Sequence, residues 1–195
     1  MPQKSAIVVH ACGFGSKEEI CEIAKLRLDL ATDCAGAEEE SDIIISGGVP
    51  YQKGSRLLAH LMGEWLKNHM LNYRSINYAI DGFDSSTDVQ NIIRIAQNRQ
   101  FANLIIISST WHLWVLKPLY RYWAKKLDYL GQISFRALND EIDLCYTSKK
   151  TVWFYSFYGL LVEMAIEFRL FKPLDKFLSS IFSKRKNGYP VTGCS

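Results

Sequence analysis

The sequence predicts an α/β fold, a Rossmann-like, doubly wound and mainly parallel sheet of about five strands with helices on both faces. A helical appendage is expected at the C-terminal end. Three observations support this prediction. Short apolar runs rich in β-branched residues recur at 6–9, 43–45 and 104–107, as expected of strands buried on both faces. Amphipathic helical patterns separate the runs. Each run ends in a small polar or glycine-rich loop.

The first half of the chain contains two strand–helix units. A strand is expected at 6–9, and Ser16 is a suitable N-cap for a helix at about 17–33, whose apolar residues share one face. An acidic loop precedes a second strand at 42–45. Leucines then recur at helical spacing over about 54–70, which predicts the second helix.

The third unit combines a strand at 76–80 with a helix at about 87–98. The loop between them is rich in turn-forming residues. Because hydroxyl side chains satisfy the first N–H groups of a helix, we expect Ser86 or Thr87 to be the N-cap.

The fourth strand is expected at 103–107, and His112 starts or immediately precedes a helix that continues to about residue 126. Pro118 lies within this helix and is expected to kink it. A fifth strand is expected at 132–137. This repeated alternation implies right-handed crossovers and therefore parallel strands.

Residues 1–148 form the predicted α/β domain, and 149–195 form an aromatic-rich helical segment. The segment is expected to contain a helix at 151–170 and a short second helix at 174–182. We expect its aromatic side chains to pack on the domain or on a second copy of the chain. Packing on a second copy would make this segment a homodimer face, and contact with a membrane surface is the alternative.

Composition narrows the class of protein. The 195 residues are 48% hydrophobic and 22% charged with a net charge of +3, so a folded core is expected and nucleic acid is not an expected partner. Five cysteines without a C-x-x-C pair, and a polar start without a signal-like segment, favour the cytoplasm and no metal site. Glu163 interrupts the longest apolar stretch, 152–166, and Glu167 and Arg169 follow it, so no transmembrane span is expected.

The polar loops define a candidate site, because the carboxyl ends of parallel strands meet at one edge of a sheet. His112 is the candidate catalytic residue, since a histidine there can act as general acid or base. The candidate ligand-binding residues follow the strand ends: His10, Gly13, Ser46, Gly47, Gly48, Asp81, Asp84, Ser86, Thr87, Ser108 and Ser109.

Each candidate also has a structural interpretation. Glycines after a strand expose N–H groups to an anion, but many turns use them for shape alone. Asp81 or Asp84 can hold a ribose hydroxyl, a water molecule or a metal ion, or can simply form the turn. No nucleophile motif is present; Ser46 or Ser108 with His112 as base stays open.

Four motifs occur in an order that resembles a known family. They are the stretch from Ala24 to Ala31 with its arginine, Arg27, in the first helix; Ser46-Gly47-Gly48 after a strand; Asp81, Asp84, Ser86 and Thr87 leading into a helix; and Ile107-Ser108-Ser109 followed by His112. Together they resemble the YdcF-like and SanA-like family, a group described as a domain of unknown function. Ser86, Asp84 and Val115 depart from its usual asparagine, serine and arginine, which marks a divergent member.

The resemblance implies a Rossmann-like sheet with a polar cleft. Some members have been linked to S-adenosylmethionine and others to the bacterial envelope, but no reaction comes with the resemblance. We therefore expect a cytoplasmic protein that binds an anionic or nucleotide-like small molecule, S-adenosylmethionine being one candidate. The alternative is a non-enzymatic, envelope-associated or protein-interaction module that acts through its aromatic C-terminal helix.

Overall fold

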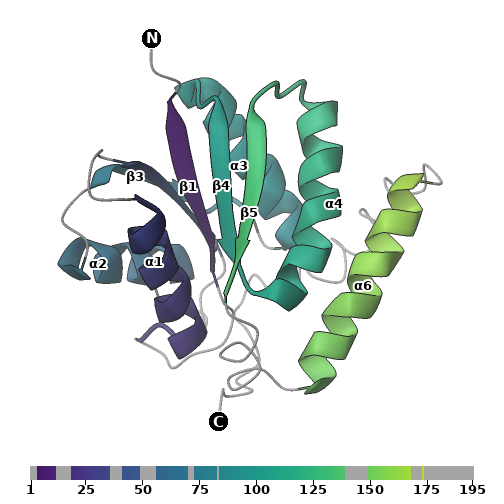
Figure 1. Ribbon diagram of the computed structural model, residues 1–195, viewed down its shortest axis with the longest axis horizontal. Helices are drawn as coiled ribbons and strands as arrows, with labels where there is room; N and C mark the ends of the chain where they lie inside the picture. Colours follow the sequence, from purple (N-terminus) through teal and green to yellow (C-terminus); the bar gives the residue numbers. More distant parts are fainter. Residues whose placement is uncertain are drawn as a thin grey trace.

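The structure is a computed structural model that describes residues 4–11, 19–35, 41–48, 56–69, 73–82, 84–138, 149–167 and 173. These residues contain a five-stranded, all-parallel sheet in the order β3-β2-β1-β4-β5 (Figure 1). The strands are β1 (Ser5–His10), β2 (Ser41–Ser46), β3 (Tyr73–Ala79), β4 (Asn103–Ser108) and β5 (Gln132–Ala137). The predicted parallel α/β fold is confirmed.

Strand β1 lies at the centre of the sheet. Val8 pairs with Ile44 of β2 on one side and with Ile106 of β4 on the other. All three side chains are fully buried, whereas Ile105, next to Ile106 on β4, is only partly buried. Continuous β-branched runs suit this position, because a central parallel strand is covered by helices on both faces.

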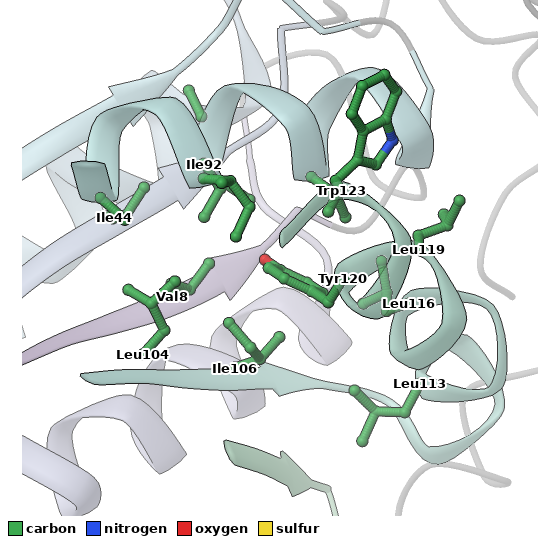
Figure 2. Close-up of a cluster of buried hydrophobic side chains, with 14 of the residues drawn as sticks. Val8, Ile44, Ile92, Leu104, Ile106, Leu113, Leu116, Leu119, Tyr120 and Trp123 are labelled. Carbon is green, nitrogen blue, oxygen red and sulfur yellow. The ribbon is translucent and has the colours of Figure 1, made fainter. Parts of the chain in front are cut away.

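The described residues form five helices: α1 (Glu22–Ala35), α2 (Leu58–His69), α3 (Ser85–Arg99), α4 (Thr110–Lys126) and α6 (Lys149–Glu167). Helices α1 and α2 pack on one face, and α3 and α4 pack on the other. Helix α6 lies outside α4 (Figure 1). Figure 2 shows the α3–α4 side of the core, where the hydroxyl of Tyr120 turns toward β1.

Several predicted helix and strand boundaries are wrong. Helix α3 begins at Ser85, two residues earlier than expected, and α4 begins at Thr110 rather than at or just after His112. The helix expected from residue 17 begins at Glu22, because Ile20 and Cys21 are buried in an extended segment before it; Ser16 lies outside the described residues. The helix expected from residue 54 begins at Leu58, since residues 56 and 57 are not helical.

Strand β3 also differs from its prediction, since it begins at Tyr73 and excludes Ile80. Within the described part of the chain it is an edge strand that pairs with β2 alone, so polar residues such as Ser75 and Asn77 are accommodated along it. The apolar pattern therefore predicted only the second half of β3, from Ile76 onward.

The N-cap of α3 is Asp84, not Ser86 or Thr87. The Asp84 carboxylate accepts the Thr87 N–H at 2.8 Å, and the Thr87 hydroxyl accepts the Asp84 N–H at 3.2 Å. This reciprocal capping box satisfies two backbone donors at once, and it uses Thr87 at the third helical position. Ser86 instead accepts a hydrogen bond from the indole N–H of Trp123.

Helix α6 confirms the predicted helix over 151–167. Val162 and Ala165 are buried against α4, and Gly159 lies against the backbone of Trp114. A second set of side chains stays exposed on α6: Trp153, Phe157, Leu160, Leu161 and Met164. The short helix expected at 174–182 lies outside the described residues. Within the described chain, no helix is both long and apolar enough to cross a membrane.

Candidate functional site

The candidate site lies where the strand order reverses. Strand β2 pairs with one edge of β1, and β4 pairs with the opposite edge of β1. The carboxyl ends of β1 and β4 therefore flank the topological switch point, at which open α/β sheets bind ligands. His10 ends β1, and Ser108 ends β4.

His10 is buried and holds a hydrogen bond on each ring nitrogen. Its Nε2 lies 2.9 Å from the Tyr120 hydroxyl, and its Nδ1 lies 3.1 Å from Ser46 Oγ. Burial, and then the positive charge of Arg27, lower the pKa of His10 to about 3. The imidazole is therefore neutral at physiological pH and links β1 to β2 and α4.

His112 lies beside His10, with the two ring centroids 5.7 Å apart. Its Nδ1 is 2.9 Å from Ser108 Oγ, and its Nε2 is 3.1 Å from Ser85 Oγ. Burial, followed by the charges of Arg27 and His10, holds the pKa of His112 well below its usual value. His112 is the third residue of α4, so the end of β4 and the start of α4 together fix the position of its ring.

Arg27 reaches the switch point from α1. Its Nη1 donates to the backbone oxygens of His10 at 2.8 Å and Ala11 at 3.2 Å, and its Nη2 donates to Ser109 Oγ at 2.8 Å. The side chain is 0% exposed, and its Nε has no hydrogen-bond partner among the described residues. None of the described carboxylates forms a salt bridge with it.

Asp88 is a further ionisable group at this edge, and its side chain is partly exposed. Its Oδ1 is buried without a hydrogen-bond partner in the described part of the chain and lies over Gly82. Burial, and then the negative charge of Asp84, raise the pKa of Asp88 to about 8. A hydrogen bond from Ser46 lowers the pKa, but its effect is smaller. A polar chain thus runs from Tyr120 through His10 and Ser46 to Asp88.

The two glycines after β2 are surrounded by protein atoms. Gly47 has φ +139° and donates its N–H to Ala79 O at 3.3 Å. A Cβ on Gly48 would lie 1.9 Å from Ile80 O. Packing therefore requires glycine at both positions, and the backbone conformation requires it at Gly47 as well, whatever their part in ligand binding.

The structure brings five of the predicted residues into one buried cluster: His10, Ser46, Ser108, Ser109 and His112. Asp81 is exposed, and Asp84 and Thr87 form the α3 cap beside the cluster. Ser86 turns to Trp123 instead. Gly13 lies outside the described residues.

Sequence reasoning assigned no site role to four residues that join the cluster, namely Arg27, Ser85, Asp88 and Tyr120, although Arg27 lies in one of the motifs that carry the family resemblance. A signal existed for two of them. Arg27 lies four residues before buried Ala31, and Asp88 lies four residues before buried Ile92, so helical periodicity placed both charges on core-facing stripes. A charge on such a stripe is rare and marks a functional candidate.

A hollow of about 400 Å³ lies away from this cluster, between edge strand β3 and α3; its lining is Ile76, Asn77, Tyr78, Ile95, Asn98 and Arg99. Within the described chain, no group of three or more His, Cys, Asp or Glu side chains is arranged to hold a metal ion.

In comparisons with protein-family models, curated proteins and solved structures, none matches this chain. The resemblance to the YdcF-like and SanA-like family and the cytoplasmic location therefore stay predictions.

Proposed function

We propose that this protein binds an anionic or nucleotide-like small molecule at the carboxyl edge of β1 and β4. The observation that carries the proposal is Arg27, a fully buried guanidinium with no carboxylate partner among the described residues. An unpaired buried charge costs several kcal/mol, at least about 3 in typical cases. An anion placed beside Arg27 would offset much of that cost.

The surroundings of Arg27 favour an anion over a neutral ligand. His10 and His112 are neutral, so the guanidinium is the local source of positive charge. The first N–H groups of α4 point toward the same edge, and a helix N-terminus favours negative charge. Ser109 is the N-cap of α4, yet its hydroxyl accepts from Arg27 rather than from the helix.

Candidate ligands share a carboxylate or phosphate group. S-adenosylmethionine belongs to this set, because its methionine part carries a carboxylate, and the family resemblance favours it. Nucleotides and sugar phosphates belong to it through their phosphates. A guanidinium pairs with either group in a bidentate geometry, which a lysine ammonium cannot reproduce.

Titration calorimetry and thermal shift would test the proposal with inorganic phosphate, S-adenosylmethionine, nucleotides and sugar phosphates as separate probes. We expect at least one to bind saturably and to raise the melting temperature. Arg27→Lys keeps the charge but loses the planar fork, so its affinity should fall at least about tenfold, which is about 1.4 kcal/mol.

The matched control is Arg121→Lys, because Arg121 is exposed on α4 and, among the residues that the structure describes, forms a salt bridge only with Glu163. It should bind like the wild type. If no probe binds, or if Arg27→Lys binds as tightly as the control, the proposal is wrong.

A second candidate function is a protein-interaction module that acts through α6. Trp153, Phe157, Leu160 and Met164 are exposed and follow one another at steps of four, three and four residues. This spacing is that of a helix–helix seam, so a second copy of the chain is the favoured occupant. The rings of Trp153 and Phe157 stack with centroids 5.7 Å apart.

Light scattering would test this second candidate. The wild type should be a dimer, and the double variant Trp153→Glu, Phe157→Glu should be a monomer of unchanged secondary structure. Leu130→Glu is the control, since Leu130 is 96% exposed but lies before β5. A monomeric wild type that sediments with lipid vesicles would show that a membrane surface is the partner instead.

A further inference from the structure

We propose that Ser85 and His112 form a nucleophile–base pair that transfers the acyl group of an ester substrate. Ser85 Oγ lies 3.1 Å from His112 Nε2, and Ser108 Oγ lies 2.9 Å from His112 Nδ1. A hydroxyl in contact with an imidazole that a third group orients is the arrangement of serine nucleophiles. The anionic character of the substrate rests on the proposed function, whereas the pair itself rests on this geometry.

Ser85 is placed differently from the two serines considered from the sequence. Ser46 and Ser108 are fully buried, and Ser46 contacts His10 rather than Nε2 of His112. Ser85 is partly exposed and is the first residue of α3. The first N–H groups of a helix lack carbonyl partners within it. The Asp84 carboxylate takes the Thr87 N–H, so the N–H groups of Ser85 and Ser86 are the donors at this helix start for the oxyanion that forms during attack.

His112 is held for the role of base. When its Nδ1–H donates to Ser108 Oγ, the Nε2 lone pair faces the Ser85 hydroxyl. The lowered pKa of His112 keeps that lone pair available at neutral pH, but the nearby charge of Arg27 disfavours the imidazolium that the attack would form. An anionic group on the substrate would offset Arg27, so such a substrate would strengthen its own general base.

The reaction balances with water as the only co-reactant. Ser85 Oγ bonds to the acyl carbon while its proton moves to His112 Nε2. The imidazolium then gives this proton to the departing alcohol as the ester C–O bond breaks. Water, deprotonated by the same nitrogen, attacks the acyl-enzyme; the carboxylic acid leaves, and Ser85 recovers its proton.

A fluorophosphonate probe tests the pair directly, because it phosphonylates an activated serine and releases fluoride. The full chain is treated with the probe, and the modified peptide is identified by mass spectrometry. We expect one adduct, on Ser85, and none in Ser85→Ala. His112→Gln should react at least about 100-fold more slowly. Labelling of the wild type should also slow in acid, as His112 gains a proton.

Ser134→Ala is the control, since Ser134 lies on edge strand β5 and donates to a backbone carbonyl. It should be labelled at the wild-type rate. An unlabelled wild type, an adduct on another serine, or labelling of Ser85 that is independent of pH would overturn the pair. Phosphate titration of Ser85→Ala separates the two proposals. If Ser85→Ala binds phosphate but the probe does not label the wild type, the nucleophile–base pair alone is refuted. If the probe labels Ser85 of the wild type but phosphate does not bind, the anion site alone is refuted.

Discussion

Asp88→Asn tests whether the buried carboxyl at the site is protonated in the folded protein. Burial and the charge of Asp84 raise its pKa from the ordinary 3.8 to about 8. Between these two pH values the unfolded chain has lost the proton that the folded protein keeps. The free energy of unfolding therefore falls as pH rises from about 4 to 8.

The size of the effect follows from the shift. At pH 7 the full shift corresponds to about 4 kcal/mol of lost stability. Asp88 is partly exposed and lies in the first turn of α3, whose dipole favours the carboxylate. We therefore expect the lost stability at pH 7 to be about 2 kcal/mol. Asparagine resembles the neutral acid in shape, so Asp88→Asn should match the wild type at pH 4 and exceed its stability at pH 7.

Urea unfolding at a series of pH values from 4 to 8 would measure this difference. Asp33→Asn is the control, because Asp33 is exposed on α1. If the wild type is the more stable protein at pH 7, the Asp88 carboxylate is ionised and stabilised in the fold. A difference between the two proteins that does not change with pH would refute the reasoning equally.

Three further predictions concern packing and charge. The pKa of His10 is lowered to about 3, so the unfolded chain alone gains this proton below pH 6.5; the wild type should lose about 2–4 kcal/mol as pH falls toward 3, and His10→Gln should lose less in urea unfolding. Gly48→Ala should cost about 3 kcal/mol in the same assay, because the new Cβ would lie 1.9 Å from Ile80 O. Gly159→Ala should loosen α6 from α4, because its Cβ would lie 2.8 Å from Trp114 O; faster proteolysis of α6 would report this.

The sheet was predictable because its strands are buried on both faces. Strand β5 was predicted with its observed bounds, and β1, β2 and β4 within one residue at each end. Strand β3 was displaced, since an edge strand needs less apolar sequence and its register with β2 shifts between Ser41 and Asp42. The capping residue of α3 was missed because Asp84, Ser85, Ser86 and Thr87 all favour such positions.

The sequence predicted where the candidate site lies in the fold, but not which of its side chains contact one another. Parallel strands bring His10, Ser46 and His112 to one edge wherever their helices pack, so strand ends alone located them. Which hydroxyl meets which imidazole depends on the helices. Ser85 and Tyr120 reach the histidines from α3 and α4, whose rotation about their own axes no local pattern specifies.

The position of β1 also has a consequence for how the chain folds. Its pairing with β4 joins Ser5 to Asn103, which are separated by 98 residues. Closing so long a loop is entropically unfavourable before the contacts that reward it have formed. We therefore expect the docking of β4 against β1 to limit the refolding rate. Until then, one edge of an almost wholly apolar strand remains unpaired, and in this interval the protein is most prone to aggregate.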